Sequence, residues 1–409
     1  MNEPLATKNH YFNIAVIVAA LGYFVDIYDL LMFSIIRVES LKDLGLSAEG
    51  IKNEGLFIIN VQMLGLLVGG ILWGVLADKK GRLSVLFASI ILYSLGNIAN
   101  GFVTNTDQYA LVRFISGIGL AGELGAGITL VSELLPKDKR GVGTSLVAGI
   151  GLSGAVVAFI IKENFHWRTC YFIGGGLGFL LLFLRIKVAE SGMFESAKKA
   201  NVQKGNFWMF FNNKKRFKKY LLAILIGLPT WFVIGILISF SKEFAEKMNV
   251  IGVVDPGKSV MFAYVGLSLG DIMSGLVSQW LRSRKKALYI FYGITIIAMI
   301  WFFNLHGASA TEVYWACALL GFGIGFWAIF VTVAAEQFGT NLRATSATTV
   351  PNMVRGSLNP ITILFTALQA SQGYIGSAII TAIVCMLIAI VAAAASDETF
   401  GKDLNYMEA

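Results

Sequence analysis

Long apolar segments separated by short polar ones follow one another along almost the whole chain. A helix needs about 20 mainly apolar residues to cross the hydrocarbon core of a bilayer, and the sequence offers twelve runs of this kind. The predicted spans are residues 11–37, 55–77, 83–104, 108–135, 141–161, 167–187, 220–241, 258–281, 287–305, 311–337, 344–369 and 373–396. The pattern therefore predicts an all-α integral membrane protein.

The pattern is also duplicated. The segment GLLVGGILWG at 65–74 returns as GLSLGDIMSG at 266–275, with five of ten positions identical. ELLPKDKRG at 133–141 returns as EQFGTNLRA at 336–344, so a glutamate and an arginine recur at the same separation. Internal repeats of this size are typical of secondary transporters. We predict a six-helix bundle in 1–187, a basic cytoplasmic linker in 188–219, and a second six-helix bundle with a short cytoplasmic tail in 220–409.

Composition supports a protein embedded in lipid. Of 409 residues 56% are hydrophobic and only 14% charged, and the mean hydropathy is +0.70, values outside the range of soluble domains. The spans leave no room for an enzyme module, and no nucleophile and base stand at a recognisable spacing. The three cysteines lie far apart without metal-ligand spacing. We expect no enzyme activity, no cofactor and no metal, and a monomer in the bilayer.

The basic residues predict the orientation, because cytoplasmic loops retain Lys and Arg. With the N-terminus inside, the inner loops and both tails hold 23 of the 33 basic residues and the outer loops hold 8. We therefore expect a multi-pass protein of the plasma (inner) membrane with both termini in the cytoplasm. The net charge of +8 follows from this topology, and no nucleic acid is needed to explain it.

Several motifs resemble those of the major facilitator superfamily. GVLADKKGR at 74–82 matches the signature between helices 2 and 3, Gly-x-x-x-Asp-basic-x-Gly-basic. RFISGIGLAGE at 113–123 and VAESGMFE at 188–195 are similar to motifs of its metabolite symporters, and DIYDL at 26–30 resembles a motif of aromatic acid symporters, with Ile27 in place of a glycine. More distantly the chain resembles sugar porters. The resemblance implies twelve transmembrane helices in two pseudo-symmetric six-helix bundles.

The 74–82 loop is the first candidate for gating. Glycines at 74 and 81 permit a tight turn and a close helix approach, and the carboxylate of Asp78 is favoured at a helix N-terminus. The resemblance implies that Asp78 contacts helix 11 and holds an inner gate shut; a purely structural turn is the alternative. Glutamate–arginine pairs at the inner ends of spans 4 to 5 and 10 to 11 could break as the halves move, or be surface charge. The gating candidates are Gly74, Asp78, Gly81, Arg82, Glu133, Arg140, Glu336 and Arg343.

Carboxylates inside spans are the candidates for proton coupling, because a charge at that depth costs about 2.5–3.5 kcal/mol and needs a partner, water or a function. Asp26 and Asp29 share one face of the first span. Helices 1 and 4 line the central cavity in the resembled architecture, so Glu123 would converge with them there. The alternative is a static polar cluster with Arg113 or tyrosines, although Arg113 is expected to extend towards the outer interface.

Arg355, between two prolines in PNMVRGSLNP, is the candidate anchor for a substrate carboxylate; an ion pair with Asp271 or an aspartate of helix 1 is the alternative. Asp271 stands where the first repeat has Gly70, so it is either a specificity element or a partner of Arg355. Aromatic candidates for the substrate site are Tyr28, Trp231 and Trp327.

Together these observations predict a secondary active transporter that works by alternating access. We expect proton-coupled symport, in the uptake direction, of a small organic solute that carries a carboxylate. A proton-driven antiporter that exports an organic solute, and a transporter-like solute receptor without turnover, are the alternatives.

Overall fold

The computed structural model of the protein describes residues 14–123, 125, 127, 147–185 and 206–402. Within these ranges the chain is helical, apart from short connections and one isolated bridge between Ile251 and Ser309. The division of the chain at 188–219 stays a prediction, because most of that segment lies outside the described ranges.

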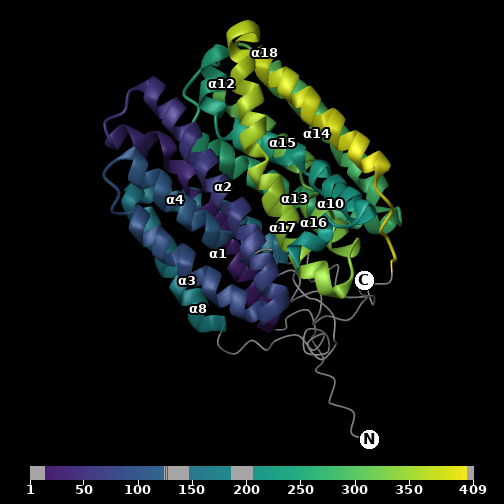
Figure 1. Cartoon of the computed structure of the whole chain (residues 1–409). Helices are drawn as coiled ribbons and strands as arrows, with labels where there is room; N and C mark the ends of the chain where they lie inside the picture. The colour runs from purple at the N-terminus through teal and green to yellow at the C-terminus, as the bar shows by residue number, and fades with distance from the viewer. Residues whose placement is uncertain (1–13, 124, 126, 128–146, 186–205, 403–409) are drawn as a thin grey trace, which may run out of the picture.

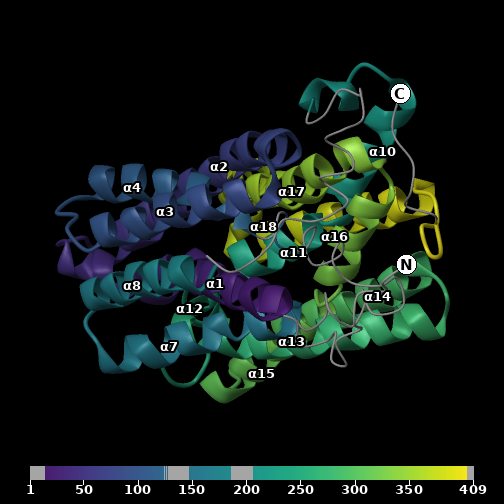
Figure 2. The same ribbon diagram turned by 90° about the horizontal axis from the view of Figure 1, so that it is seen from below.

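The first half contributes α1 (Ile14–Asp43), α2 (Ala48–Lys80), α3 (Arg82–Asn100), α4 (Thr106–Leu120), α7 (Gly154–Asn164) and α8 (Trp167–Arg185). The second half contributes η2 (Phe207–Phe210), α10 (Lys214–Ile226), α11 (Leu228–Phe232), η3 (Val233–Ile238), α12 (Ser241–Lys247), α13 (Pro256–Trp280), α14 (Arg284–Phe303), α15 (Ala310–Gly323), α16 (Trp327–Glu336), α17 (Thr340–Gly356) and α18 (Leu358–Ala395). Figure 1 shows α1 to α4 and α8 gathered on one side of the molecule and α10 and α13 to α16 on the other, and Figure 2 shows the same bundle from below.

Ten stretches of the described chain are long and apolar enough to cross a membrane. The last, Asn341–Ala395, covers the predicted span 344–369 and all but the final residue of the predicted span 373–396, and Gly373 interrupts its helix with a φ of 68°. The predicted span 108–135 is described only in its first part, as α4. The all-α fold predicted from the apolar pattern is confirmed.

The repeat is visible in how the helices pack. A Cβ on Gly65 of α2 would overlap the backbone of Phe114 in α4, and a Cβ on Gly266 of α13 would overlap the backbone of Ala318 in α15. Gly65 and Gly266 open the two copies of the repeated segment. Because lipid gives helices no hydrophobic reason to associate, close backbone contact over small residues supplies much of the packing.

Several predicted spans are broken rather than continuous helices. Span 220–241 is divided into α10, α11 and the π-helix η3. Span 311–337 is divided into α15 and α16, which are separated by residues 324–326. Apolar periodicity reports only the length of such a span, so it gives no sign of these breaks. Interrupted helices are tolerated at membrane depth where protein surrounds the freed backbone groups.

Candidate functional site

The centre of the bundle holds an arginine of one half facing an aspartate of the other. Nη2 of Arg355 in α17 lies 3.9 Å from Oδ2 of Asp26 in α1, and both side chains are buried. Nη1 of Arg355 donates to Oδ1 of Asn352 at 3.1 Å, and its Cζ lies 5.9 Å from the ring centroid of Trp327. Neither carboxylate oxygen of Asp26 has a hydrogen-bond partner among the described residues. Arg355 is therefore paired with an aspartate of the first span, and its Nε has no hydrogen-bond partner among the described residues.

Asp29, one turn further along α1, has a different partner. Nη1 of Arg113 in α4 donates to its Oδ1 at 2.8 Å, and Nη2 donates to its backbone carbonyl at 2.9 Å. The arginine also donates from Nε to Gln62 at 3.2 Å. Arg113 is fully buried, so the expectation that it reaches the outer interface is wrong. Asp29 outweighs the interface as a partner because its carboxylate and its backbone carbonyl each accept a hydrogen bond from the charged guanidinium.

Glu123 forms a third buried pair, within the first half. Its two carboxylate oxygens accept from Nη1 and Nη2 of Arg185, the last residue of α8. Both side chains lie against Gly22 of α1, where a Cβ would overlap them. Arg185 stands at the end of the predicted span 167–187, where a basic residue gives no sign of a buried partner. The three predicted proton carriers therefore lie near one another, but each faces a different arginine.

The remaining substrate-site candidates lie in two different settings. The Tyr28 hydroxyl donates to the Cys170 carbonyl at 2.7 Å, inside the first half, which gives no support to a substrate role. Trp231 is buried in α11, with no hydrogen-bond partner for its Nε1 among the described residues. Trp327 lies beside Arg355, and Asp271 accepts from the backbone N–H of Ala328 at 2.9 Å. Trp327 and Asp271 therefore belong to the surroundings of the central pair.

At the end of the bundle predicted to be cytoplasmic, here called the inner end, α2 contacts α17. Oδ2 of Asp78 accepts from the backbone N–H of Thr345 at 2.8 Å and from its hydroxyl at 2.5 Å. Gly81 has a φ of 106°, in the region that favours glycine, and a Cβ on Gly74 would lie 3.3 Å from the Thr345 Cα. This contact of Asp78 with α17, which belongs to the eleventh predicted span, is the one that the family resemblance implies. Only the backbone of Arg82 is described, at the start of α3.

The second copy of this loop is held within its own half. Gln279 stands where the first copy has Asp78. The start of α14 is fixed instead by Glu398, which accepts from the Ser283 hydroxyl at 2.5 Å, and by Arg284, which pairs with Glu336 at 3.1 Å. Among the other gating candidates, Arg343 is buried near the start of α17, and Glu133 and Arg140 lie outside the described residues.

The opposite, outer end is also closed by contacts between the halves. Nη2 of Arg37 in α1 lies 2.7 Å from Oε1 of Glu243 in α12 and donates to the Ser239 carbonyl at 3.2 Å. A second pair joins Lys162 of α7 to Asp255 before α13, at 2.8 Å. Neither pair could be found from the sequence, because the partners stand 206 and 93 positions apart at loop ends and no spacing signal connects them.

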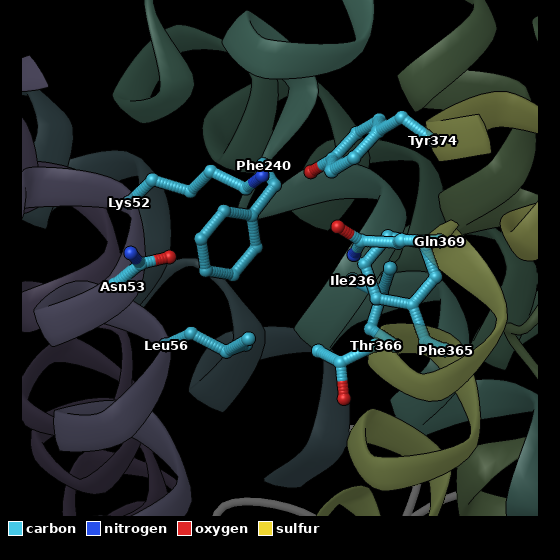
Figure 3. Close-up of a pocket in the computed structure, with 9 residues that line it drawn as sticks. All are labelled: Lys52, Asn53, Leu56, Ile236, Phe240, Phe365, Thr366, Gln369 and Tyr374. Carbon is cyan, nitrogen blue, oxygen red and sulfur yellow. The ribbon is translucent and has the colours of Figure 1, made fainter. Parts of the chain in front are cut away.

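A small cavity lies beside this outer contact, between the halves. It has a volume of ≈ 50 Å³, and Figure 3 shows the side chains that line it, from Lys52 of α2 on one side to Tyr374 of α18 on the other. Phe240 lines the cavity, and the guanidinium carbon of Arg37 lies over its ring, 4.3 Å from the ring centroid. The cavity would accommodate water but not an organic solute.

The family model described as Major Facilitator Superfamily matches residues 19–358. The chain belongs to this family. Among its relatives are the putative niacin/nicotinamide transporter NiaP of Bacillus subtilis, 27% identical over 96% of both chains, and the niacin transporter NiaP of Acinetobacter baylyi, 27% identical over 99% of this chain and 97% of the relative. The fold is similar to that of the proton:xylose symporter XylE, with a TM-score of 0.73 at 16% identity, covering 96% of this chain and 97% of the other.

The membership establishes several of the sequence predictions. The protein is a multi-pass membrane transporter with two six-helix halves, it binds a small-molecule substrate within the membrane, and it is not an enzyme. The structural similarity supports the fold alone, because the identity to XylE is low.

Proposed function

We propose that the transporter works by alternating access and takes up a small carboxylate-bearing metabolite together with protons. The observation that carries the proposal is the central pair. Arg355 is buried between the halves and faces Asp26 at 3.9 Å, longer than a normal charge-assisted hydrogen bond. Asp29 and Glu123 each have a close arginine of their own half. The guanidinium of Arg355 is therefore the donor best suited to receive a solute carboxylate.

Charge balance at this pair connects the solute to the proton. The buried charges of Arg355 and Asp26 balance one another when no solute is bound. A solute carboxylate on Arg355 would leave one excess negative charge in a low-dielectric centre, where an uncompensated ion is strongly disfavoured. Protonation of Asp26 restores neutrality. We therefore propose Asp26 as the proton carrier, with one proton for each monocarboxylate, and static ion-pair roles for Asp29 and Glu123.

The contacts at the two ends suit a carrier that opens on one side at a time. The inner contact between Asp78 and Thr345, and the outer pairs of Arg37 and Lys162, all join one half to the other. Opening the inner end would break the first contact, and opening the outer end would break the others. The orientation predicted from basic residues makes the inner end cytoplasmic, with both termini on that side.

The chemistry of the site favours a flat aromatic acid. The ring of Trp327 lies 5.9 Å from the guanidinium of Arg355, so a planar ring could pack on the indole while its carboxylate bonds to the arginine. Niacin is a pyridine carboxylate, and of two relatives at 27% identity one is named a niacin transporter and the other a putative niacin/nicotinamide transporter. Nicotinate and related aromatic monocarboxylates are therefore the first solutes to test.

The test is binding and uptake by purified protein in proteoliposomes, with a panel of nicotinate, nicotinamide, benzoate, proline, betaine and xylose. We expect a carboxylate to be taken up, Arg355→Gln to abolish its binding, and Arg355→Lys to weaken it, because lysine lacks the planar fork. The matched control is Arg282→Gln, which removes a charge from the exposed surface of the same half. Uptake of nicotinamide or xylose in preference to every acid, or full binding by Arg355→Gln, would refute the carboxylate site.

A further inference from the structure

The helix break between α15 and α16 lies next to the central pair of Arg355 and Asp26. α15 ends at Gly323 and α16 begins at Trp327. The first N–H groups of a helix have no partner within it, and inside a membrane each unsatisfied group costs several kcal/mol. Phe326, which precedes α16, supplies no side-chain hydrogen bond to this turn. A partner must come from outside the helix.

Asp271 of α13 supplies one. Its Oδ1 accepts from the backbone N–H of Ala328, in the first turn of α16, at 2.9 Å. A carboxylate at this end also interacts favourably with the helix dipole. The segment before α16 can approach α13 this closely because residue 325 is a glycine. A Cβ on Gly325 would overlap the backbone of Gly270. The alternative in which Asp271 simply neutralises Arg355 is not needed to explain a buried acid here.

The first repeat has no counterpart of this contact. Gly70 stands at the position equivalent to Asp271, and a Cβ there would overlap the side chain of Asn352 in the other half. An aspartate at residue 70 would have to displace the Asn352 side chain of α17. The acid is therefore specific to the second half, which is the half that contributes Arg355 and Trp327.

The contact connects directly to the proposed substrate site. Trp327 is the first residue of α16 and neighbours Ala328, whose amide Asp271 holds. The Trp327 ring lies 5.9 Å from the guanidinium of Arg355. We propose that Asp271 is a positioning residue of the substrate site: by holding the first turn of α16 it sets the Trp327 ring beside Arg355. The inference rests on the proposed function in one respect, namely that the solute binds at Arg355.

The first arm of the test needs no substrate. Hydrogen exchange measured by mass spectrometry reports the protection of the Ala328 amide in wild type, Asp271→Ala and Asp271→Asn. We expect faster exchange at the start of α16 in Asp271→Ala and near-normal exchange in Asp271→Asn, whose side-chain oxygen still accepts. Ser274→Ala is the matched control, because its buried hydroxyl donates to the Asp271 backbone within the same helix. If Asp271→Ala does not fold, Asp271→Ser, whose shorter side chain ends before Ala328, replaces it.

The second arm measures affinity for labelled nicotinate, or for the panel acid that the wild type binds best. We expect Asp271→Ala to weaken binding by at least about tenfold, as for the loss of one hydrogen bond to a charged group, with Asp271→Asn within about threefold of wild type. Unchanged exchange in Asp271→Ala, or equal losses of affinity in the alanine and asparagine variants, would overturn the positioning role. If no acid binds the wild type, the proposed function fails while the exchange result still decides the role of Asp271.

Discussion

The outer ion pair between Arg37 and Glu243 gives the sharpest prediction about conformational change. Arg37 is fully buried and Glu243 is 15% exposed, with 2.7 Å between Nη2 and Oε1. The two residues belong to different halves, so the pair exists only while the outer end is closed. Replacing Glu243 with glutamine keeps the size of the side chain and removes its charge. The variant should therefore destabilise the outward-closed form and leave the outward-open form unchanged.

The size of the effect follows from the burial of the pair. A hydrogen bond to a charged group contributes about 1.5–3 kcal/mol when it is shielded from water. Every 1.4 kcal/mol changes an equilibrium constant tenfold. Glu243→Gln should therefore raise the ratio of outward-open to outward-closed protein by about tenfold to a hundredfold, while the second pair, Lys162 with Asp255, stays intact.

The assay is the rate at which maleimide modifies a cysteine at Ile236, which is buried and lines the outer cavity. The background replaces the three buried cysteines, Cys170, Cys317 and Cys385. We expect the modification rate to rise with the open population in Glu243→Gln. Glu246→Gln is the control, because Glu246 is 65% exposed and lies 4.0 Å from Lys242 of its own helix. Equal rates in the two variants would refute a closing role for the Arg37 pair.

Three further variants test other parts of the structure. Asp78→Asn weakens the hydrogen bonds from Thr345 that hold the inner end closed. The inward-open form, which is closed on the outer side, then gains population, so maleimide modification of the Ile236 cysteine should become slower. An unchanged rate would show that the Asp78 contact does not hold the inner end closed. Glu123→Gln leaves Arg185 buried without its counter-charge and should destabilise the protein by about 3–5 kcal/mol, seen as a large fall in melting temperature in detergent; an unchanged melting temperature would contradict the buried pair. Burial raises the pKa of Glu398, but hydrogen bonds from the Ser283 hydroxyl and from the backbone N–H groups of Phe400, Arg284 and Lys285 outweigh it and hold the pKa at about 2. Since this pKa lies below the unfolded value of about 4.3, the stabilisation is complete above pH ~4.3 and is lost as the pH falls towards 2. Glu398→Gln should therefore have a lower melting temperature than wild type at neutral pH and lose less stability on acidification. An equal fall in melting temperature on acidification in the variant and in wild type would contradict this.

The fold follows from the sequence largely because the bilayer imposes one length and one polarity on every span. Residues 14–37 of the first predicted span lie within α1, residues 55–77 lie within α2, and the repeated GLLVGGILWG and GLSLGDIMSG segments pack against their neighbours in equivalent ways. The breaks within the spans could not be predicted in the same way. A π-helix at 233–238 and an interruption at 324–326 leave the apolar pattern unchanged.

The partners of the buried charges were harder to predict than the charges themselves. Asp26, Asp29 and Glu123 were identified because an acid inside an apolar span is conspicuous. Arg185 and Arg37 stand at span ends and therefore resemble ordinary loop residues. The rotation of each helix against its neighbours decides that Arg113 pairs with Asp29 and Arg355 with Asp26. Spacing along the chain does not reveal this rotation.

The measurement that tests the central claim most directly is internal pH in proteoliposomes that contain a pH-sensitive dye, while nicotinate or another acid of the panel is added outside. The account predicts that the interior acidifies as the acid enters, that Arg355→Gln abolishes both events, and that Asp26→Asn abolishes the proton movement. Alkalinisation on addition of the solute would show exchange instead of symport, and uptake of an acid with no change of internal pH in wild type would contradict the proposed coupling at Asp26.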